Sequence, residues 1–204
     1  MSSGFSKYDR KEITQSIYCY PDSNILKNKA GIMDAKVLDE YEANITAMRQ
    51  YMLEDKPVKG KFGINHLKNI HKYIFQDIYP FAGKLRLEDI WKGETYFCKT
   101  QFIESTLDSL LTHFKEENYL KGLDAEEFAK RISFYMSELN IIHPFREGNG
   151  RTIREFIRCL ALEAGFELDW SLVDSQELLD AAIIAVNDNL EPLESCLYQA
   201  IVKD

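Results

Sequence analysis

The sequence has few of the residues that mark a nucleic-acid binder or a disulfide-rich protein. Its 204 residues include only four cysteines and five prolines, and 25 lysines and arginines stand against 33 aspartates and glutamates. The formal net charge of −8 argues against general nucleic-acid binding, because neutralising phosphates requires a basic face. Any anion site must therefore be local, and we expect no direct contact with nucleic acid.

Long apolar runs are also missing. No stretch approaches the roughly eighteen apolar residues that a membrane span needs, and the N-terminal "MSSGFSKYDRKEITQ" has no apolar signal-peptide core. We therefore expect a cytoplasmic chain with no membrane contact. Four scattered cysteines without CxxC spacing favour reduced thiols over a disulfide framework or a zinc site: Cys19, Cys98, Cys159 and Cys196.

Nothing in the sequence divides the chain. There is no internal repeat, low-complexity tract or proline-rich linker, which predicts a single domain over residues 1–204. A chain of this length, 45% hydrophobic, can bury roughly 70% of its unfolded surface around one core.

Helical periodicity dominates the chain after an irregular segment that ends near residue 34. Two apolar stripes recur at three- and four-residue steps: Leu38, Tyr41, Ile45, Met48 and Met52, then Ile64, Leu67, Ile70, Ile74 and Phe75. Further helices are predicted over 100–118, 124–141, 149–165, 175–187 and 190–202. Short β-prone runs on both sides of Lys92-Gly93 predict a hairpin. The expected fold class is all-α with one small hairpin.

The segment "HPFREGNGRTIR", residues 143–154, concentrates groups suited to phosphate chemistry. Gly148 and Gly150 have no Cβ to block a close approach, and a helix beginning near Asn149 offers its N-terminal N–H groups to an anion. Arg151, Arg154 and Arg158 would lie within about 60° on one helix face. Such arginines could hold further phosphates, so a nucleoside triphosphate is the expected ligand.

Two further residues of this segment suit catalysis. Glu147 is a hard oxygen ligand for a Mg²⁺ held mainly by phosphates and water. His143 has a side chain that can accept a proton from an attacking hydroxyl. On the opposite face of the same helix, apolar residues would pack into the core and turn the arginines outward: Ile153, Phe156, Ile157, Leu160 and Ala164.

Each of these features has a plainer interpretation. A GxG before a helix is weak evidence for phosphate binding, a row of arginines is usually a solvated face, and a lone histidine is more often structural. The conjunction of all of them within one loop and its helix is harder to explain as packing. Other nucleotide and zinc motifs, including GxxxxGK[ST], HExxH and a complete GxGxxG, are absent from the sequence.

The segment also resembles a known family. "HPFREGNGRTIR" is similar, without departure, to the H-x-F-x-[DE]-G-N-G-R-x-x-R pattern of Fic-domain adenylyltransferases. "IHKYIFQDIYPFAGKLR" (70–86) and "NILKNKAGI" (24–32) resemble other segments of that family, so the resemblance covers about residues 20–200. It implies a Fic-type helical bundle with a β-hairpin flap, in agreement with the periodicity.

The resemblance implies a role for each motif residue. His143 would be the general base on a target hydroxyl, and Glu147 would bind Mg²⁺. The anion hole would be formed by Gly148, Asn149 and Gly150. Arg151 and Arg154 would hold the β- and γ-phosphates of ATP, while Phe145 anchors the loop in the core. The target-docking flap would consist of Trp91, Lys92, Gly93, Glu94, Thr95, Tyr96 and Phe97, although its aromatic residues could equally belong to the core.

The activity implied by the resemblance is AMP transfer from ATP to a hydroxyl side chain of another protein. There are three alternatives. The chain could bind ATP reversed and phosphorylate its target, as some relatives do; it could use another nucleotide-linked donor; or it could be an inactive binding module. Relatives that phosphorylate resemble Fic proteins lacking the second glycine and second arginine of the motif, whereas Gly150 and Arg154 are present here. The intact His143 argues against an inactive module.

Resemblance to bacterial Fic toxins makes the ATPase subunits of DNA gyrase and topoisomerase IV the expected targets. Many Fic proteins carry an inhibitory helix with the pattern [ST]-x-x-x-E-[GN], and this sequence has none. The nearest matches begin at Thr100 and Thr112 and fail at the last position, where Ser105 and Glu117 stand. We therefore expect a small antitoxin that supplies the inhibitory glutamate in trans; restraint by self-association or by low expression is the alternative.

Overall fold

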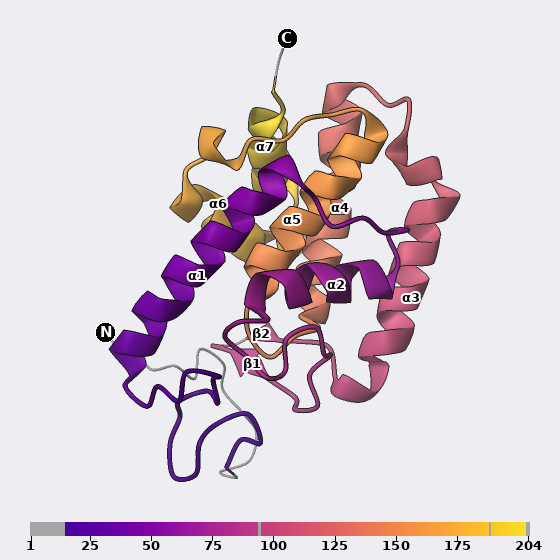
Figure 1. Cartoon of the computed structure of the whole chain (residues 1–204). Coiled ribbons are helices and arrows are strands. Elements are labelled where there is room, and N and C mark those ends of the chain that lie inside the picture. Colours follow the sequence, from indigo (N-terminus) through magenta and orange to yellow (C-terminus); the bar gives the residue numbers. More distant parts are fainter. Residues whose placement is uncertain (1–14, 94, 188, 203–204) are drawn as a thin grey trace.

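The fold is a bundle of helices with one short hairpin at its edge (Figure 1). The computed structural model describes residues 15–202 except 94 and 188. Within this part the chain forms seven α-helices: α1 (Ala35–Asp55), α2 (Ile64–Phe75), α3 (Thr100–Glu116), α4 (Ala125–Ile142), α5 (Asn149–Ala164), α6 (Ser175–Ala185) and α7 (Glu191–Ala200). Strands β1 (Trp91–Lys92) and β2 (Thr95–Tyr96) are antiparallel, with Trp91 opposite Tyr96. The all-α prediction with a single small hairpin is confirmed.

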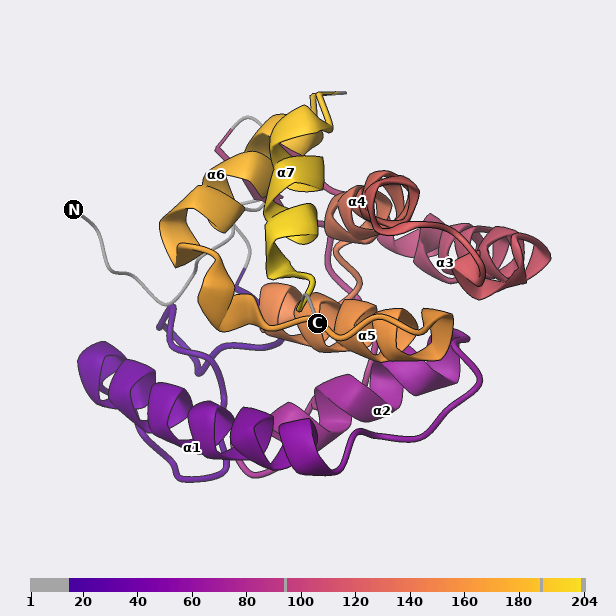
Figure 2. The ribbon, with the colours of Figure 1, turned by 90° about the horizontal axis from the view of Figure 1, so that it is seen from above.

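Helices α4 and α5 form the centre of the bundle. Helix α4 packs against α3, α5 and α7, and α2 packs on α5. Seen from above, α1 and α2 lie on one side of α5, and α6 and α7 on the other (Figure 2). The apolar face of α5 is buried as predicted at Ile153, Phe156, Ile157 and Leu160, and Ala164 is half-buried. The loop between α4 and α5 therefore starts and ends on rigid elements.

Most predicted helix boundaries agree with the structure to within two residues, and the second apolar stripe is buried on α2 except for half-buried Ile64. The stripe on α1 is confirmed only in part. Leu38 is fully buried, Tyr41 and Ile45 are half-buried against the core, and Met48 and Met52 are 51% and 46% exposed. Helix α1 instead turns Glu42 and Thr46 inward.

The arginine face of α5 does not point to solvent as predicted. Arg151 and Arg158 lie under α1, where they find partners that satisfy their charge. Arg158 Nη2 donates to the carbonyl of Leu53 at 2.7 Å, and its Nε lies 2.8 Å from Glu155. Burial of these charges is tolerated because each is paired. Arg158 therefore ties α1 to α5, and the expectation that it extends the phosphate face is not supported.

Arg86 connects the base of the hairpin to the end of α4. Its side chain is fully buried, and its guanidinium donates to the carbonyl of His143 at 2.8 Å and to that of Ile142 at 3.3 Å. It also donates to the carbonyls of Glu88, at 2.8 Å, and Cys98. These carbonyls include orphan acceptors of a helix C-terminus, which must be satisfied when they are buried.

Two further predictions concern the chain as a whole. All four cysteines are free, and all but half-buried Cys98 are buried, as expected for reduced thiols. Among the described helices none is long and apolar enough to cross a bilayer.

Replacing Arg86 with methionine should lower the free energy of unfolding by about 2–4 kcal/mol, because several buried carbonyls would lose their donor. Urea denaturation measures this loss. Arg49→Met is the matched control, since Arg49 is paired with Asp77 at the surface and should contribute less than about 1 kcal/mol. Equal losses for the two variants would contradict the role given to Arg86.

Candidate active site

The loop between α4 and α5 is closed on itself by one side chain. Asn149 accepts the backbone N–H of Phe145 on Oδ1 at 2.9 Å and donates from Nδ2 to the carbonyl of Phe145 at 2.8 Å. Asn149 is 1% exposed, so both bonds lie away from water. Phe145 is fully buried, which confirms it as the anchor of the loop, and its ring stacks on His71 at 3.9 Å.

The loop ends in a helix N-terminus that faces a cavity. The N–H groups of Asn149, Gly150 and Arg151 have no bonded acceptor in the part of the chain that the structure describes, as expected for the first turn of α5. They border a cavity of about 360 Å³ lined by Asp39, Glu42, Ala43, Glu147, Gly148, Asn149, Gly150, Arg151 and Arg154. The predicted anion-hole residues therefore lie together in one wall. The Asn149 side chain is engaged with Phe145, so only its backbone can contribute.

The two glycines of the motif serve different purposes. Gly148 has a φ of +78°, and a Cβ there would lie 2.1 Å from the ring of Phe75. It is therefore required by backbone conformation and by the close packing of α2. A Cβ on Gly150 would meet only Arg154 Nη1, at an ordinary 3.6 Å. Nothing in the fold requires a glycine at position 150, but its bare backbone keeps the wall of the cavity open.

His143 ends α4 in a left-handed conformation, with φ of 48°, which is uncommon for a residue other than glycine and is often found at functional sites. Its Nδ1 lies 3.0 Å from the carbonyl of Asn140, so Nδ1 carries the proton and Nε2 can accept one. Burial, partly offset by this bond and reinforced by the charges of Arg86 and Lys92, lowers the pKa of His143 to about 3. The imidazole is therefore neutral at physiological pH.

Glu147 lies at the start of the helix and opens on the cavity. Its side chain is 6% exposed; Oε1 accepts the N–H of Gly148 at 2.9 Å and lies 3.6 Å from Arg151 Nη2. No cluster of three potential metal ligands occurs among the described residues. A single carboxylate of this kind fits Mg²⁺ that takes its remaining ligands from phosphates and water.

Arg151 and Arg154 border the same cavity but differ in whether a carboxylate pairs with them. Arg151 is paired with Glu42, its Nη2 lying 2.5 Å from Oε1. Arg154 forms no ion pair or side-chain hydrogen bond with any described residue. Burial and the neighbouring charge of Arg151 lower the pKa of Arg154, and no acid opposes them there. Arg154 is thus a desolvated cation beside an anion cavity, and an incoming phosphate can satisfy it.

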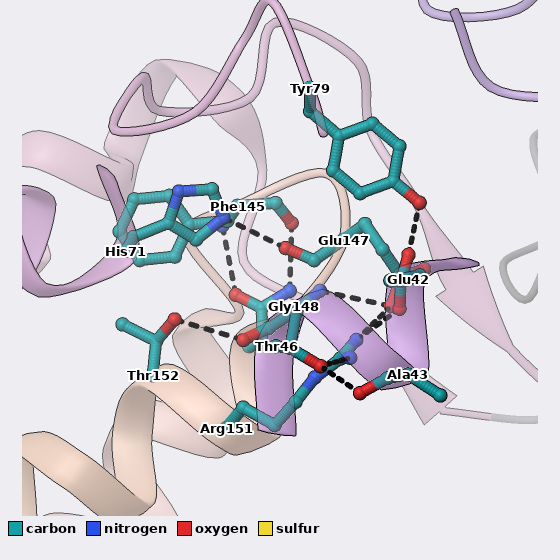
Figure 3. A network of polar contacts seen from close by, with 11 residues as sticks. Glu42, Ala43, Thr46, His71, Tyr79, Phe145, Glu147, Gly148, Arg151 and Thr152 are labelled. Carbon is teal, nitrogen blue, oxygen red and sulfur yellow. Dashed lines mark hydrogen bonds and ion pairs between the residues drawn. The ribbon is translucent and has the colours of Figure 1, made fainter. Parts of the chain in front are cut away.

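Sequence reasoning missed a buried polar network around the motif (Figure 3). Its members come from other helices: Glu42 and Thr46 from α1, His71 from α2, and Tyr79 from the turn after α2. The four-residue spacing of Glu42 and Thr46 shows that they share a helix face. No feature of the sequence indicates that this polar face, and not the methionine face, packs inward.

His71 supports the backbone of the motif from below. Its Nδ1 accepts the N–H of Gly83 at 2.7 Å, so Nε2 carries the proton and donates to the carbonyl of Glu147 at 3.0 Å. Burial lowers the pKa of His71 to about 3, which keeps this tautomer neutral. His71 thereby links the turn "YPFAG" to the loop between α4 and α5.

The hairpin lies beside His143. Phe97 stacks on the imidazole, with ring centroids 3.9 Å apart, and is half-buried. Trp91 is half-buried and Tyr96 is 65% exposed, so none of the three aromatic residues belongs to the core. Lys92 and Gly93 are exposed, Thr95 is half-buried, and Glu94 lies outside the described residues.

A larger hollow of about 760 Å³ lies between α4 and α7, but it has the wrong charge for a polyphosphate. One lysine, Lys130, stands there against five carboxylates: Asp124, Glu126, Glu127, Glu191 and Glu194. The cavity at the motif has two arginines and a helix N-terminus beside three carboxylates, one of which is paired with Arg151, and is the better candidate.

Known proteins share both the sequence and the fold. Residues 61–161 match the model of the Fic/DOC family. A protein adenylyltransferase of Bartonella schoenbuchensis is 41% identical over 91% of this chain, and the chain spans 39% of that relative's length. A probable protein adenylyltransferase of Salmonella typhimurium is 36% identical, with 90% of this chain and 91% of the relative covered.

Among solved structures, the N-terminal Fic domain of a Bartonella quintana effector with bound ADP superposes with a TM-score of 0.85 at 30% identity. The match covers 92% of this chain and 95% of that one. The identities and the coverage establish common descent, and the superposition establishes a common fold. The chain belongs to the Fic/DOC family, among relatives named protein adenylyltransferases.

Proposed function

We propose that this protein adenylyltransferase transfers AMP from ATP to a hydroxyl side chain of another protein. The observation that carries the proposal is the conjunction at one loop of a neutral imidazole, helix amides with no acceptor among the described residues, and the half-buried cation Arg154, which pairs with no described residue. Relatives named adenylyltransferases and a related Fic domain with bound ADP support the same nucleotide chemistry.

In the proposed reaction, each of these groups has one role. The target hydroxyl oxygen attacks the α-phosphorus of ATP while its proton moves to Nε2 of His143; the bond between the α-phosphorus and the bridging oxygen breaks, and pyrophosphate leaves. Amides of Gly148, Asn149 and Gly150 face the developing charge, and Arg154 meets the distal phosphate. Mg²⁺ at Glu147 would neutralise charge on the phosphates.

The hairpin is the proposed docking site for the target segment. It borders His143 through Phe97, and its short strands could pair with an extended peptide by strand addition. Trp91, Lys92, Gly93, Glu94, Thr95, Tyr96 and Phe97 make up this flap. Such docking would bring a target hydroxyl to the imidazole.

Two neighbouring activities are less well supported. Phosphorylation with reversed ATP is disfavoured because Gly150 leaves the cavity wall open and Arg154 is available for a distal phosphate. An inactive binding module would not need His143 held in a proton-accepting tautomer. A different nucleotide-linked donor would share the phosphate chemistry and differ only at the base.

The proposed biological role is that of a toxin acting in the cytoplasm on type II topoisomerases, the ATPase subunits of DNA gyrase or topoisomerase IV, and restrained by an antitoxin. The missing inhibitory pattern [ST]-x-x-x-E-[GN] supports restraint in trans. Arg154 forms no carboxylate pair within the residues described, which leaves room for a glutamate from another chain.

Incubation with bacterial lysate and ATP labelled at the α-phosphorus should label a target protein, whereas label at the γ-phosphorus should not transfer. His143→Ala should reduce transfer by about 10²-fold or more while ATP still binds, because the proton acceptor is lost. Arg154→Ala should weaken ATP more than AMP in calorimetry. Transfer of the γ-label, or near-normal transfer by purified His143→Ala, would overturn the proposed reaction.

The two glycines should respond differently to alanine. Gly148→Ala should lower the melting temperature, since its Cβ collides with Phe75 and its φ is positive. Gly150→Ala should leave the melting temperature within a few degrees but weaken ATP binding, because a methyl group then stands in the cavity wall. Calorimetry and thermal unfolding separate these effects. A wild-type ATP affinity in Gly150→Ala would show that the phosphates do not approach this backbone.

Expression of the chain alone in bacteria should arrest growth, and His143→Ala should not. Co-expression of the small protein encoded beside it, if that protein supplies the glutamate for Arg154, should restore growth. Normal growth with soluble, intact wild-type chain would contradict the toxin role while leaving the in vitro transfer untouched.

A further inference from the structure

We propose that Glu42 of α1 is a positioning residue for AMP transfer: it fixes Arg151 against the wall of the phosphate cavity and leaves Arg154 to bind the distal phosphate. The inference rests on the proposed function. Glu42 lies outside the motif and acts through Arg151, with no contact to the reacting atoms required.

Arg151 is held from four directions. Its Nη2 donates to Glu42 Oε1 at 2.5 Å, and its Nη1 donates to Thr46 Oγ1 at 3.1 Å (Figure 3). The centre of the guanidinium lies 4.7 Å from the centroid of the Phe75 ring, and Nη2 is 3.6 Å from Glu147 Oε1. A guanidinium with two hydrogen-bonded ends and a stacked face has little freedom to follow a ligand.

Glu42 is itself held by a hydrogen bond from Tyr79. Its side chain is 4% exposed, and the hydroxyl of Tyr79 donates to Oε2 while Arg151 occupies Oε1. Burial, followed by the charge of Glu42, raises the pKa of Tyr79, so the hydroxyl remains a donor. Burial alone would lower the pKa of Arg151, but the charges of Glu42 and Glu147 raise it. Tyr79 and Arg151 therefore both keep their protons, and each donates a hydrogen bond to one oxygen of Glu42.

This arrangement gives the two motif arginines different tasks. The charge of Arg151 is largely balanced by Glu42, whereas Arg154 has no described counter-ion. A carboxylate in the wall of an anion cavity weakens phosphate binding in the ground state. It is compatible with catalysis if a fixed Arg151 keeps ATP in the reactive pose, since only interactions that favour the transition state raise the rate of the chemical step.

Two other roles for Glu42 predict different effects. If Glu42 only ties α1 to α5, neutralising it should lower stability and leave kcat unchanged. If Glu42 blocks the cavity as an inhibitor, neutralising it should raise kcat. Of the three roles, only positioning predicts that neutralising Glu42 increases the affinity for ATP and at the same time lowers kcat.

The test is Glu42→Gln in the full chain, with thermal unfolding, calorimetry of ATP and steady-state AMP transfer as the three measurements. We expect ATP to bind about 3- to 10-fold more tightly, because the amide removes the negative charge and releases Arg151 toward the phosphates. We expect kcat to fall by about 10-fold or more. Glu40→Gln, an exposed acid on the same helix, is the matched control and should change neither quantity.

Thr46→Val provides a second variant that changes no charge and keeps the side chain compact. It removes the anchor of Arg151 Nη1 and should also lower kcat, so it carries the test if Glu42→Gln does not fold. Unchanged or increased kcat, or weaker ATP binding in Glu42→Gln, overturns the inference. Absence of transfer by the wild-type chain contradicts the proposed function instead, and calorimetry then still reports whether Glu42 opposes phosphate binding.

Discussion

The two hydrogen bonds between the Asn149 side chain and the backbone of Phe145 hold the loop on which the site depends. The loop they close runs from His143, which ends α4, to Gly148, which precedes α5. Both residues have a left-handed backbone conformation. The left-handed conformation is unfavourable for His143 but costs a glycine little, and each of the two bonds contributes on the order of 1 kcal/mol. These bonds fix the backbone between His143 at the end of α4 and the first amides of α5, and Gly148, Asn149 and Gly150 of that segment line the cavity.

A second constraint comes from burying charge between α1 and α5. A buried ion pair is weak evidence for stability but is costly to leave incomplete. Glu42 satisfies Arg151, Tyr79 satisfies Glu42, and Arg158 reaches the carbonyl of Leu53. Polar partners thus help to set the position of α1 over the cavity, together with the buried side chains of Leu38 and Leu53, while Met48 and Met52 remain exposed.

The sequence predicts what is local and misses what is not. Helix ranges follow from the 3.6-residue period, and the motif can be read because His143 to Arg154 are contiguous. The buried face of α1 could not be predicted, because Glu42 finds its partners 37 and 109 residues away. His71 is missed for the same reason, since it supports a carbonyl 76 residues further along. The exposure of the flap aromatics depends on hairpin packing that no local pattern encodes.

The central claim is that the loop orients ATP by its phosphates so that the α-phosphorus meets His143. A crystal structure of the chain with a non-hydrolysable ATP analogue and Mg²⁺ tests it most directly. The account predicts the γ-phosphate on Arg154, the metal at Glu147 and the α-phosphorus as the phosphorus nearest His143 Nε2. A nucleotide bound in reverse, with its γ-phosphorus nearest His143, would contradict it.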